Sequence, residues 1–400
     1  MKFLLACIEI ALGIASLVIF LPACAFFLEI IFGLMKHRSP APTKGERPRL
    51  AVLVPAHNEA SIIHRTLRSI VPGLNPADRL VVIADNCSDE TADIASREGA
   101  EVIRRTDLER RGKGYALDFG IRHLEIDAPD VVVIIDADCV VERGAIDRIA
   151  HLSASTCRPV QALYLMRNME GANLKMRIAE FAWLVKNKIR PSGLQRLGLP
   201  CQLMGTGMAF TWPTISAANL ATGHIVEDMK LGLELARLGV APVFCSEALV
   251  TSEFPTSVSG AQTQRTRWEH GHLSVILNEA PRLFWDSIKR RDLGLMAMAC
   301  DLSIPPLALL ALQAAALWVL GLVLFLLLHQ TFAFAVTSTA ASLIVAAIFL
   351  AWSREARHII STRELASSVI YPVWKIPVYV KFLWRRQMDW VRSKRDGEQP

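Results

Sequence analysis

Three long apolar segments constrain most strongly what this chain of 400 residues can fold into. Residues 3–35 include only two charged side chains, and residues 304–328 and 331–352 include none. A helix of about 20 apolar residues crosses the hydrocarbon core of a bilayer. Each segment is therefore predicted to span a membrane, and the short connection at 329–330 makes the last two an antiparallel helical hairpin. A cleavable signal peptide is the alternative for the first segment, which is long and lacks a small-residue cleavage site before Lys36.

Basic residues gather on one side of these predicted spans. They follow the first segment, precede the second and follow the third: Lys36, Arg38, Lys44, Arg47, Arg49, Arg282, Lys289, Arg290, Arg291, Arg354, Arg357, Arg363 and the basic residues of the C-terminal stretch 385–395. The opposite flanks contain only Lys2 and the pair His329-Gln330. Because cytoplasmic flanks carry the excess of Lys and Arg, both large polar regions are expected in the cytosol.

Two further stretches, residues 281–300 and 369–390, combine aromatic rings with basic side chains. This combination is typical of helices that lie in the headgroup layer of a membrane. A tightly packed cytosolic helix is the alternative, since the apolar periodicity of these stretches is imperfect. Membrane lipids are thus expected partners of the chain.

Composition and charge exclude several classes of protein. Of all residues, 52% are hydrophobic and 20% charged, and the mean hydropathy is +0.32. These values exclude a disordered scaffold, a coiled coil and a collagen-like chain. A net charge of +6 is too small at this length to indicate a nucleic-acid partner. The eight cysteines include no Cys-x-x-Cys pair, which argues against a disulfide framework or a zinc ribbon.

The middle of the chain, residues 49–281, alternates short β-rich runs with helical patterns, which predicts an α/β fold. The predicted strands are residues 50–55, 80–84, 101–104 and 131–135, and the predicted helices include 59–70, 91–98 and 229–238. The last of these strands is uniformly apolar, as are strands buried on both faces. The sheet is therefore expected to be mostly parallel.

Polar side chains follow three of these strands where each strand ends. They are Asn58-Glu59 after the first, Asp85-Asn86 after the second, and Asp136 and Asp138 after the strand at 131–135. Ligands of open α/β sheets bind beyond the carboxyl ends of the strands. These side chains are therefore expected to meet in one crevice.

Asp136 and Asp138 are one residue apart at a strand end, which lets two carboxylates converge on a cation. Mg²⁺ and Mn²⁺ prefer oxygen ligands, and they bind few protein carboxylates together with substrate phosphates. A solvated loop cap is the alternative interpretation of an isolated Asp-x-Asp.

Glu227-Asp228 opens a predicted helix. Carboxylates at a helix start are favoured by the helix dipole, so simple capping is one interpretation. The functional interpretation is a general base placed over the crevice.

The segment Gln264-Arg265-Thr266-Arg267-Trp268 combines a guanidinium that can clamp a diphosphate with an indole that can face a sugar ring. A basic amphipathic helix near the membrane is the alternative. Lys113 stands between two glycines, as phosphate contacts often do, but the spacing is not that of a P-loop. Gly-x-Ser-x-Gly is absent, and no Gly-x-Gly-x-x-Gly follows the first strand, so the hydrolase and dinucleotide motifs are excluded.

Taken in order, these motifs resemble those of the family 2 inverting glycosyltransferases with a GT-A fold. The resemblance rests on Pro55-Ala56-His57-Asn58-Glu59, Asp85, Asp136-Ala137-Asp138, Glu227-Asp228 and Gln264-x-x-Arg267-Trp268. It is strongest to the membrane-embedded branch that includes cellulose, chitin, hyaluronan and poly-N-acetylglucosamine synthases and ceramide glucosyltransferase. The resemblance covers residues 49–281 and the flanking apolar segments.

The resemblance implies a nucleotide-sugar donor, usually UDP-linked, and a divalent metal, Mg²⁺ or Mn²⁺. Asp138, with Asp136, would hold the metal, and Asp228 matches the catalytic base, with Glu227 beside it. The implied donor-binding residues are Pro55, His57, Asn58, Glu59, Asp85, Lys113, Asp136 and Arg267. The implied acceptor-side residues are Gly205, Thr206, Gly207, Gln264 and Trp268.

The chain also departs from the family pattern. His57 stands where the family often has Tyr, and Asn86 replaces the acidic residue that commonly follows Asp85. Three predicted spans are fewer than cellulose synthase uses to form its own export channel, so a wide pore would require an oligomer. We therefore favour transfer of one or a few sugars to a lipid-linked or saccharide acceptor at the cytosolic face. A processive polysaccharide synthase and a non-catalytic nucleotide- or lipid-binding membrane component remain as alternatives.

The expected organisation has five parts. They are an N-terminal transmembrane helix at 1–35, a cytosolic GT-A domain at 49–280, an interfacial helix at 281–303, a transmembrane hairpin at 304–352 and a basic amphipathic tail at 353–400. We expect an integral protein of the plasma membrane, the inner membrane of a bacterium, with its catalytic domain in the cytosol.

Overall fold

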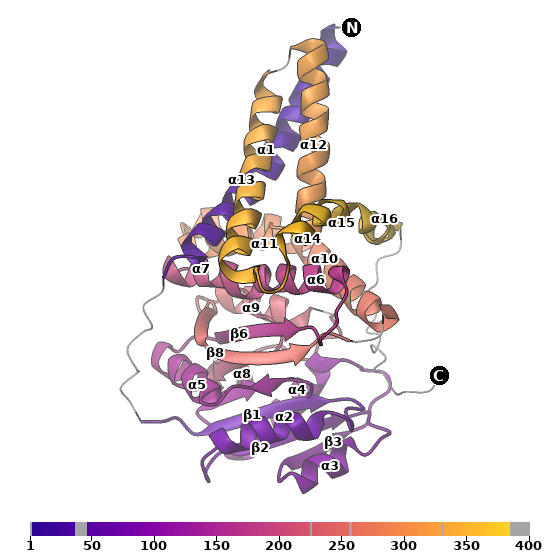
Figure 1. The fold of residues 1–400 in the computed structure, drawn as a ribbon. Helices are drawn as coiled ribbons and strands as arrows, with labels where there is room; N and C mark the ends of the chain where they lie inside the picture. Colours follow the sequence, from indigo (N-terminus) through magenta and orange to yellow (C-terminus); the bar gives the residue numbers. More distant parts are fainter. Residues whose placement is uncertain (1, 37–45, 225, 256–257, 330, 385–400) are drawn as a thin grey trace. The chain divides into compact units, whose positions relative to one another are not determined.

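The computed structural model describes residues 2–36, 46–224, 226–255, 258–329 and 331–384 (Figure 1). The chain divides into two compact units, which are considered separately. The sheet unit contains Lys36–Gly171 and Gly198–Gly271, and the apolar-helix unit contains Met1–Met35, Ala172–Leu197 and His272–Arg386. Residues 172–197 and 272–280, inside the predicted range 49–280, thus group with the apolar helices. Arg38, Lys44, Gln330 and the basic tail beyond residue 384 lie outside the described residues.

The sheet unit is built on an 8-stranded mixed sheet in the order β3-β2-β1-β4-β7-β6-β8-β5. The first four strands in this order are parallel, β7 is antiparallel to both β4 and β6, and β6 is parallel to β8. The strands are β1 (Leu50–Ala56), β2 (Arg79–Asp85), β3 (Glu101–Arg105), β4 (Val131–Ile134), β5 (Val140–Val141), β6 (Val160–Arg167), β7 (Met208–Thr211) and β8 (Val243–Glu253). The four predicted strands form the parallel part, as expected from their apolar character.

Helices between the strands enclose the core of the sheet. They are α2 (Ile63–Ile70), α3 (Thr91–Arg97), α4 (Lys113–Leu124), α5 (Ala145–Thr156), α8 (Trp212–Ser216) and α9 (Glu227–Arg237). Leu53 of β1 and Ile134 of β4 are fully buried in one cluster with Leu117 of α4, Ile215 of α8 and Leu235 of α9. Burying such side chains contributes about 1.5–3 kcal/mol each. This apolar cluster fixes the strand ends that carry the polar residues.

Helix α2 begins at Ile63, four residues later than the sequence predicts. The backbone at Asn58 has a φ of 55°, and the next two backbone N–H groups donate to side chains of the following loop. That of Glu59 donates to the Thr91 hydroxyl at 2.7 Å, and that of Ala60 to the Asp89 carboxylate at 3.1 Å. These groups are therefore already satisfied outside a helix, and residues 59–62 form a turn.

The apolar-helix unit contains three helices long and apolar enough to cross a membrane, among the described residues. The spanning stretches are Ala11–Gly33 of α1 (Lys2–Gly33), Leu307–Leu328, which is α12, and Thr331–Ala356, which begins as α13 (Thr331–Ala351). They coincide with the three predicted spans. Helices α12 and α13 run side by side (Figure 1), and a Cβ at Gly321 would lie 2.9 Å from the Thr337 hydroxyl. The predicted hairpin is thus closely packed.

Shorter helices complete this unit. They are α6 (Leu174–Leu184), α7 (Arg190–Arg196), α11 (Leu293–Leu302), α14 (Thr362–Ser367), α15 (Tyr371–Trp374) and α16 (Ile376–Trp384), while α10 (Val258–Arg290) contributes residues to both units. The predicted interfacial stretch at 281–303 comprises the end of α10 and all of α11. Trp384 and Leu383 of α16 are 83% and 74% exposed. Exposed aromatic and aliphatic groups on a basic segment fit the interfacial interpretation.

A buried ion network ties three segments of the apolar-helix unit together. The guanidinium of Arg190 in α7 donates to the carboxylate of Glu29 in α1 at 2.7 Å and to that of Asp301 in α11 at 2.5 Å. All three side chains are at most 8% exposed. The network therefore fixes α1 against α7 and α11.

Candidate active site

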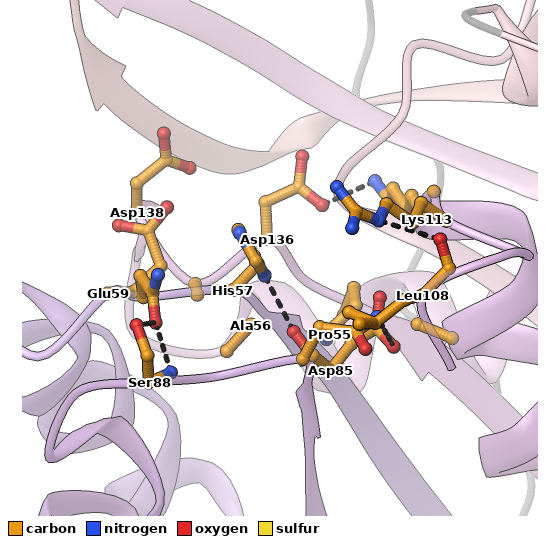
Figure 2. A pocket seen from close by; sticks show the side chains of 16 residues that line it. Pro55, Ala56, His57, Glu59, Asp85, Ser88, Leu108, Lys113, Asp136 and Asp138 are labelled. Carbon is orange, nitrogen blue, oxygen red and sulfur yellow. Dashed lines mark hydrogen bonds and ion pairs between the residues drawn. The ribbon is translucent and has the colours of Figure 1, made fainter. Parts of the chain in front are cut away.

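A pocket of about 430 Å³ lies at the carboxyl ends of β1, β2 and β4 (Figure 2). Eight residues predicted to bind the donor or the metal line it: Pro55, His57, Asn58, Glu59, Asp85, Lys113, Asp136 and Asp138. The three strand ends singled out in the sequence therefore meet in one crevice. The pocket walls also include Leu108, Arg111 and Ala116, which the sequence analysis did not single out.

The turn after β1 is held against the end of β2. The Nδ1–H of His57 donates to the backbone carbonyl of Asp85 at 2.7 Å, and the side-chain oxygen of Asn58 accepts from the backbone N–H of Ser88 at 2.7 Å. Asn tolerates the left-handed backbone that this turn requires better than most residues. His57 thus uses one ring nitrogen to fix the pocket wall.

Lys113, the first residue of α4, links two sides of the site. Its ammonium forms an ion pair with Asp136 and donates to the backbone carbonyl of Gly205 at 2.6 Å. Burial lowers the pKa of Lys113, but the neighbouring carboxylates of Asp136 and Glu227 raise it more, so the pKa lies above its ordinary value. Lys113 is therefore protonated at neutral pH.

Asp136 lies between this cation and a second carboxylate. Burial raises the pKa of Asp136, Lys113 lowers it, and Asp138 raises it further, with a net rise. The backbone N–H of Asp136 donates to the Thr206 hydroxyl at 3.0 Å. The carboxylates of this site outnumber its cations, so a bound cation would be stabilised here.

Glu227 and Asp228 form the first turn of α9, as the sequence predicts. A Cβ placed on Gly205 would lie 3.3 Å from Oδ2 of Asp228, so the carboxylate of Asp228 packs directly on this glycine. Burial and the charge of Asp228 raise the pKa of Glu227 to about 8. Carboxyl groups with a pKa shifted in this way are common at functional sites.

The guanidinium of Arg267 on α10 interacts electrostatically with the carboxyl group of Glu227. Burial lowers its pKa, and the charge of Glu227 opposes that effect. Neither Gln264 nor Trp268 lines the described pocket, nor do the three residues of the loop 205–207. One oxygen of Gln264 is buried and accepts no hydrogen bond from the residues that the structure describes. The predicted acceptor-side residues thus lie outside this pocket, and so does Arg267, which was predicted to bind the donor.

The loop before β7 is positioned by a side chain that the sequence analysis missed. Gln161 of β6 is fully buried; its amide nitrogen donates to the carbonyls of Ala162 and Thr206, and its oxygen accepts from the N–H of Met204 at 2.7 Å. Gly205 in this loop has a φ of 92°, a conformation that side chains rarely adopt. A polar residue next to the apolar start of β6 was the available sequence signal.

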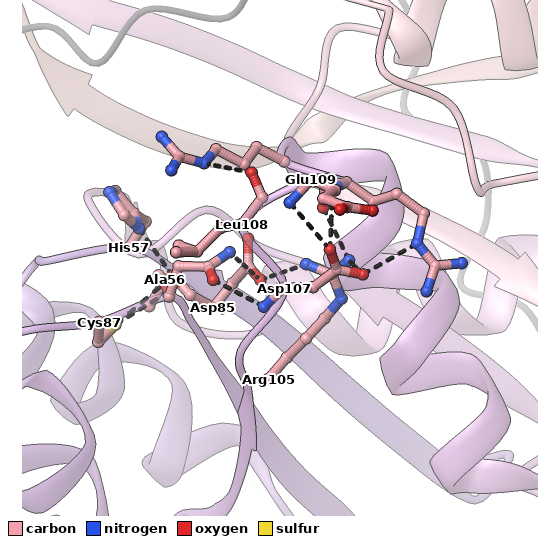
Figure 3. A network of polar contacts seen from close by, with 11 residues as sticks. Ala56, His57, Asp85, Cys87, Arg105, Asp107, Leu108 and Glu109 are labelled. Carbon is pink, nitrogen blue, oxygen red and sulfur yellow. Dashed lines mark hydrogen bonds and ion pairs between the residues drawn. The ribbon is translucent and has the colours of Figure 1, made fainter.

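Arg105 at the end of β3 is the second residue that was missed. Its guanidinium donates to Oδ1 of Asp85 at 2.6 Å and to the carboxylate of Asp107 at 3.1 Å (Figure 3). The side chains of Arg105 and Asp85 are 9% and 10% exposed. A basic residue at the carboxyl end of a strand next to that of Asp85 was the signal available in the sequence.

The metal site at Asp136 and Asp138 stays a prediction. Within the described residues, no three His, Cys, Asp or Glu side chains are arranged to hold a metal ion by themselves. Asp136 and Asp138 could therefore supply two oxygen ligands, with the rest coming from water or from the phosphates of a ligand. Hard divalent cations in phosphate-binding sites commonly have such a mixed ligand set.

Comparisons with known proteins bear on this geometry. Residues 48–271, more than half of the chain, match the family described as Glycosyltransferase like family 2. The chain is 27% identical over 271 residues to the probable glycosyltransferase YdaM of Bacillus subtilis (strain 168), covering 62% of this chain and 60% of that protein. It is 26% identical over 256 residues to the poly-beta-1,6-N-acetyl-D-glucosamine synthase of Staphylococcus epidermidis, covering 62% and 59%. The chain thus spans about 60% of the length of these curated relatives.

Among solved structures, the chain resembles the mannosyltransferase PcManGT from Pyrobaculum calidifontis, determined in complex with GDP-Man and Mn²⁺. The TM-score is 0.54 at 19% sequence identity, and the match covers 94% of this chain and 99% of that one. At this identity the likeness bears on the fold alone. The predicted fold class is confirmed: an α/β domain of the GT-A type with a mixed, mostly parallel sheet, accompanied by three long apolar helices among the described residues.

Proposed function

Because this chain belongs to the glycosyltransferase-like family 2, we propose that it is a membrane-bound inverting glycosyltransferase (EC 2.4) that uses a UDP-linked sugar. The acceptor is lipid-linked or a saccharide and is reached at the cytosolic face. One observation carries the proposal: Lys113 contacts both Asp136 in the donor pocket and the carbonyl of Gly205, on which Asp228 packs. The donor pocket and the residue proposed to activate the acceptor would therefore lie on two sides of this lysine.

In this proposal the donor occupies the 430 Å³ pocket. Lys113 and Arg267 bind the diphosphate, since charge-assisted hydrogen bonds to phosphate are strong and directional. The backbone turn of His57 and Asn58 and the carboxylate of Asp85 bind the nucleoside. A divalent cation, Mn²⁺ or Mg²⁺, held by Asp136 and Asp138 would offset negative charge on the departing diphosphate.

Asp228 acts as the general base. Its carboxylate accepts the proton of the acceptor hydroxyl while the hydroxyl oxygen attacks the anomeric carbon in line with the leaving diphosphate, which inverts the configuration. The new glycosidic bond forms as the bond from that carbon to the phosphate oxygen breaks, and the electron pair leaves with the diphosphate. Glu227 lies beside Asp228 at the start of α9, and burial together with Asp228 raises its pKa to about 8, so Glu227 holds its proton more tightly than an exposed carboxyl group does.

The acceptor lies beyond the donor pocket in this proposal. The loop Gly205-Thr206-Gly207 borders the reacting hydroxyl, and Gln264 and Trp268 of α10 contact the acceptor sugar or lipid head. The support is the packing of Asp228 on Gly205 and the buried oxygen of Gln264, which accepts no hydrogen bond from the described residues. Such an amide oxygen can accept a hydrogen bond from a hydroxyl group of the acceptor.

In this proposal the three apolar helices anchor the enzyme in the membrane, and the sheet unit lies in the cytosol; the basic flanks of these helices support that orientation. We expect the plasma membrane, the inner membrane of a bacterium. A second candidate function is a processive polysaccharide synthase, which is favoured by the similarity to the poly-beta-1,6-N-acetyl-D-glucosamine synthase. Product length on a defined acceptor separates the two, since a polymerase yields long chains from each acceptor.

The test is release of nucleoside diphosphate by the detergent-purified full chain, across nucleotide sugars, with Mn²⁺ or Mg²⁺ and a membrane lipid extract. We expect one donor to be used and the release to be abolished by EDTA and by Asp228→Asn. Glu234→Gln, which changes an exposed carboxylate on the same helix α9, is the matched control. UDP binding measured by calorimetry should persist in Asp228→Asn, and full turnover in that variant would overturn the assignment of the base. Donor binding without turnover for any acceptor would favour a non-catalytic component instead.

A further inference from the structure

We propose that Arg105 is a specificity-determining positioning residue: it occupies one oxygen of Asp85 and thereby makes the pocket select uracil over guanine. The inference rests on the proposed function, since it assumes that the pocket binds the nucleoside end of a nucleotide sugar. It adds a residue outside the pocket wall to those that recognise the donor. Arg105 does not itself line the described pocket.

The two oxygens of Asp85 have different surroundings. Oδ1 accepts from the guanidinium of Arg105 at 2.6 Å and from the side-chain amide of Asn86 at 3.0 Å. Oδ2 accepts no hydrogen bond from any group in the described part of the chain, although Asp85 lines the pocket. A carboxylate oxygen has about two lone-pair sites. Oδ1 is therefore saturated, and Oδ2 remains available to a ligand.

The orientation of Asp85 is fixed by a wider network (Figure 3). Besides Asp85, the guanidinium of Arg105 binds the carboxylate of Asp107 at 3.1 Å and the carbonyl of Arg110 at 2.7 Å. The side-chain oxygen of Asn86 in turn accepts from the N–H of Asp107 at 2.8 Å. Because each partner of Oδ1 is held elsewhere as well, rotating the carboxylate would break several hydrogen bonds. The network therefore keeps Oδ1 bound.

The pocket has a charged end and a less polar end. Lys113 and Asp136 form the charged end, and Figure 2 shows them above Asp85 and Pro55. Leu108 and Pro55 offer apolar surface beside Asp85, which suits a flat aromatic ring. With the phosphates at Lys113, the base of the donor would lie against Asp85.

The hydrogen-bonding edges of the bases then decide the preference. Uracil presents one donor, N3–H, between two carbonyl oxygens, and one free carboxylate oxygen satisfies it. Guanine presents two adjacent donors, N1–H and the 2-amino group, which pair best with both oxygens of a carboxylate. Binding guanine in that way would require displacing Arg105 or Asn86 from Oδ1. Cytosine presents an acceptor instead of an N–H at position 3, so it could reach Oδ2 only through its 4-amino group, with the lone pair of N3 facing the carboxylate.

The first test changes the ligand and leaves the protein intact. Calorimetry on the detergent-solubilised full chain with Mn²⁺ would compare UDP, UDP methylated at N3, CDP and GDP. We expect UDP to bind at least about tenfold more tightly than the other three, as expected for one lost hydrogen bond in a buried site. Equal binding of UDP and its N3-methyl analogue, or tighter binding of GDP, would overturn the inference. If none of the four binds, the proposed function fails at the donor pocket itself.

The second test changes the positioning residue. Arg105→Met frees Oδ1, so the preference for UDP over GDP should fall by about tenfold, the order expected for one charged hydrogen bond. Arg105→Lys keeps the charge and should retain part of the preference. Arg104→Met is the matched control, because the neighbouring Arg104 is 64% exposed and pairs with Asp93. If Arg105 had a purely structural role, its replacement would weaken the binding of UDP and of GDP equally. An unchanged ratio of the two affinities in folded Arg105→Met would therefore overturn the inference. If Arg105→Met does not fold, the ratio of UDP to GDP affinity is measured in Arg105→Lys, and an unchanged ratio there would overturn the inference.

Discussion

The ammonium of Lys113 donates a hydrogen bond to the backbone carbonyl of Gly205 at 2.6 Å. This bond joins the first turn of α4 to the loop before β7, two segments that are 92 residues apart in sequence. The same ammonium is paired with Asp136, so one side chain links the proposed donor pocket to the glycine on which Asp228 packs. Changes at either end of this bond are therefore expected to affect turnover.

Replacing Lys113 by Met removes the cation that faces the carboxylates of Asp136 and Glu227. We expect UDP affinity and turnover to fall by at least about tenfold, since a charged hydrogen bond is worth about 1.5–3 kcal/mol. The free energy of unfolding should fall by about 1–3 kcal/mol, because the ion pair is only partly exposed. Arg122→Met removes a cation from an exposed pair on the same helix and is the control. Unchanged UDP binding in Lys113→Met would contradict the prediction.

Gly205→Ala tests the contact between this loop and the proposed base. The new methyl group would lie 3.3 Å from Oδ2 of Asp228, at a backbone φ of 92°. Gly99→Ala is a matched control, because Gly99 has a φ of 87° and open space around the added methyl group. Both variants carry a backbone strain of about 1–2 kcal/mol, visible as similar decreases in Tm. Only Gly205→Ala should lose turnover; equal turnover in the two variants would show that the contact with Asp228 is irrelevant to the reaction.

The raised pKa of Glu227 predicts a pH dependence of stability. Its ordinary value is 4.5, and burial together with Asp228 raises it to about 8 in the folded protein. Between these values the folded state holds a proton that the unfolded state has lost, so stability decreases as the pH rises from 4.5 to 8. Glu227→Gln removes this contribution. In EDTA, the Tm of Glu227→Gln minus that of the wild type should therefore increase from pH 5 to pH 9. Parallel Tm profiles would contradict the prediction, and Glu234→Gln should give such a parallel profile.

Much of this site could be predicted from local sequence because its residues stand at strand ends. Strands β1, β2 and β4 are recognisable as short apolar runs, and parallel strands bring their carboxyl ends to one edge. Asp85 and Asp136 were found for that reason. Glu227-Asp228 at a predicted helix start is a weak signal by itself, since simple capping explains it equally well, and its predicted role came from the family resemblance.

What the sequence did not reveal depends on contacts between distant segments. Arg105 meets Asp85 only because β3 pairs with β2, and Gln161 supports the loop at Gly205 only because β6 pairs with β7. The antiparallel strand β7 inside the sheet has only four residues, too few to leave a distinct pattern in the sequence. The start of α2 was predicted too early, because Thr91 and Asp89 bind the N–H groups of the preceding turn.

The ion network of Arg190 gives a prediction for the apolar-helix unit. Arg190→Met would leave the carboxylates of Glu29 and Asp301 buried without a counter-charge. Breaking a buried pair in this way typically costs about 3–5 kcal/mol, so we expect a large decrease in Tm in detergent. Lys188→Met is the matched control: Lys188 pairs with Glu355, and both side chains are about one-third exposed, which limits the effect to about 1 kcal/mol or less. Glu29→Gln should cost less than Arg190→Met, because Asp301 still balances the guanidinium. If Arg190→Met and Lys188→Met unfold at the same temperature, the network does not hold α1 against α7 and α11.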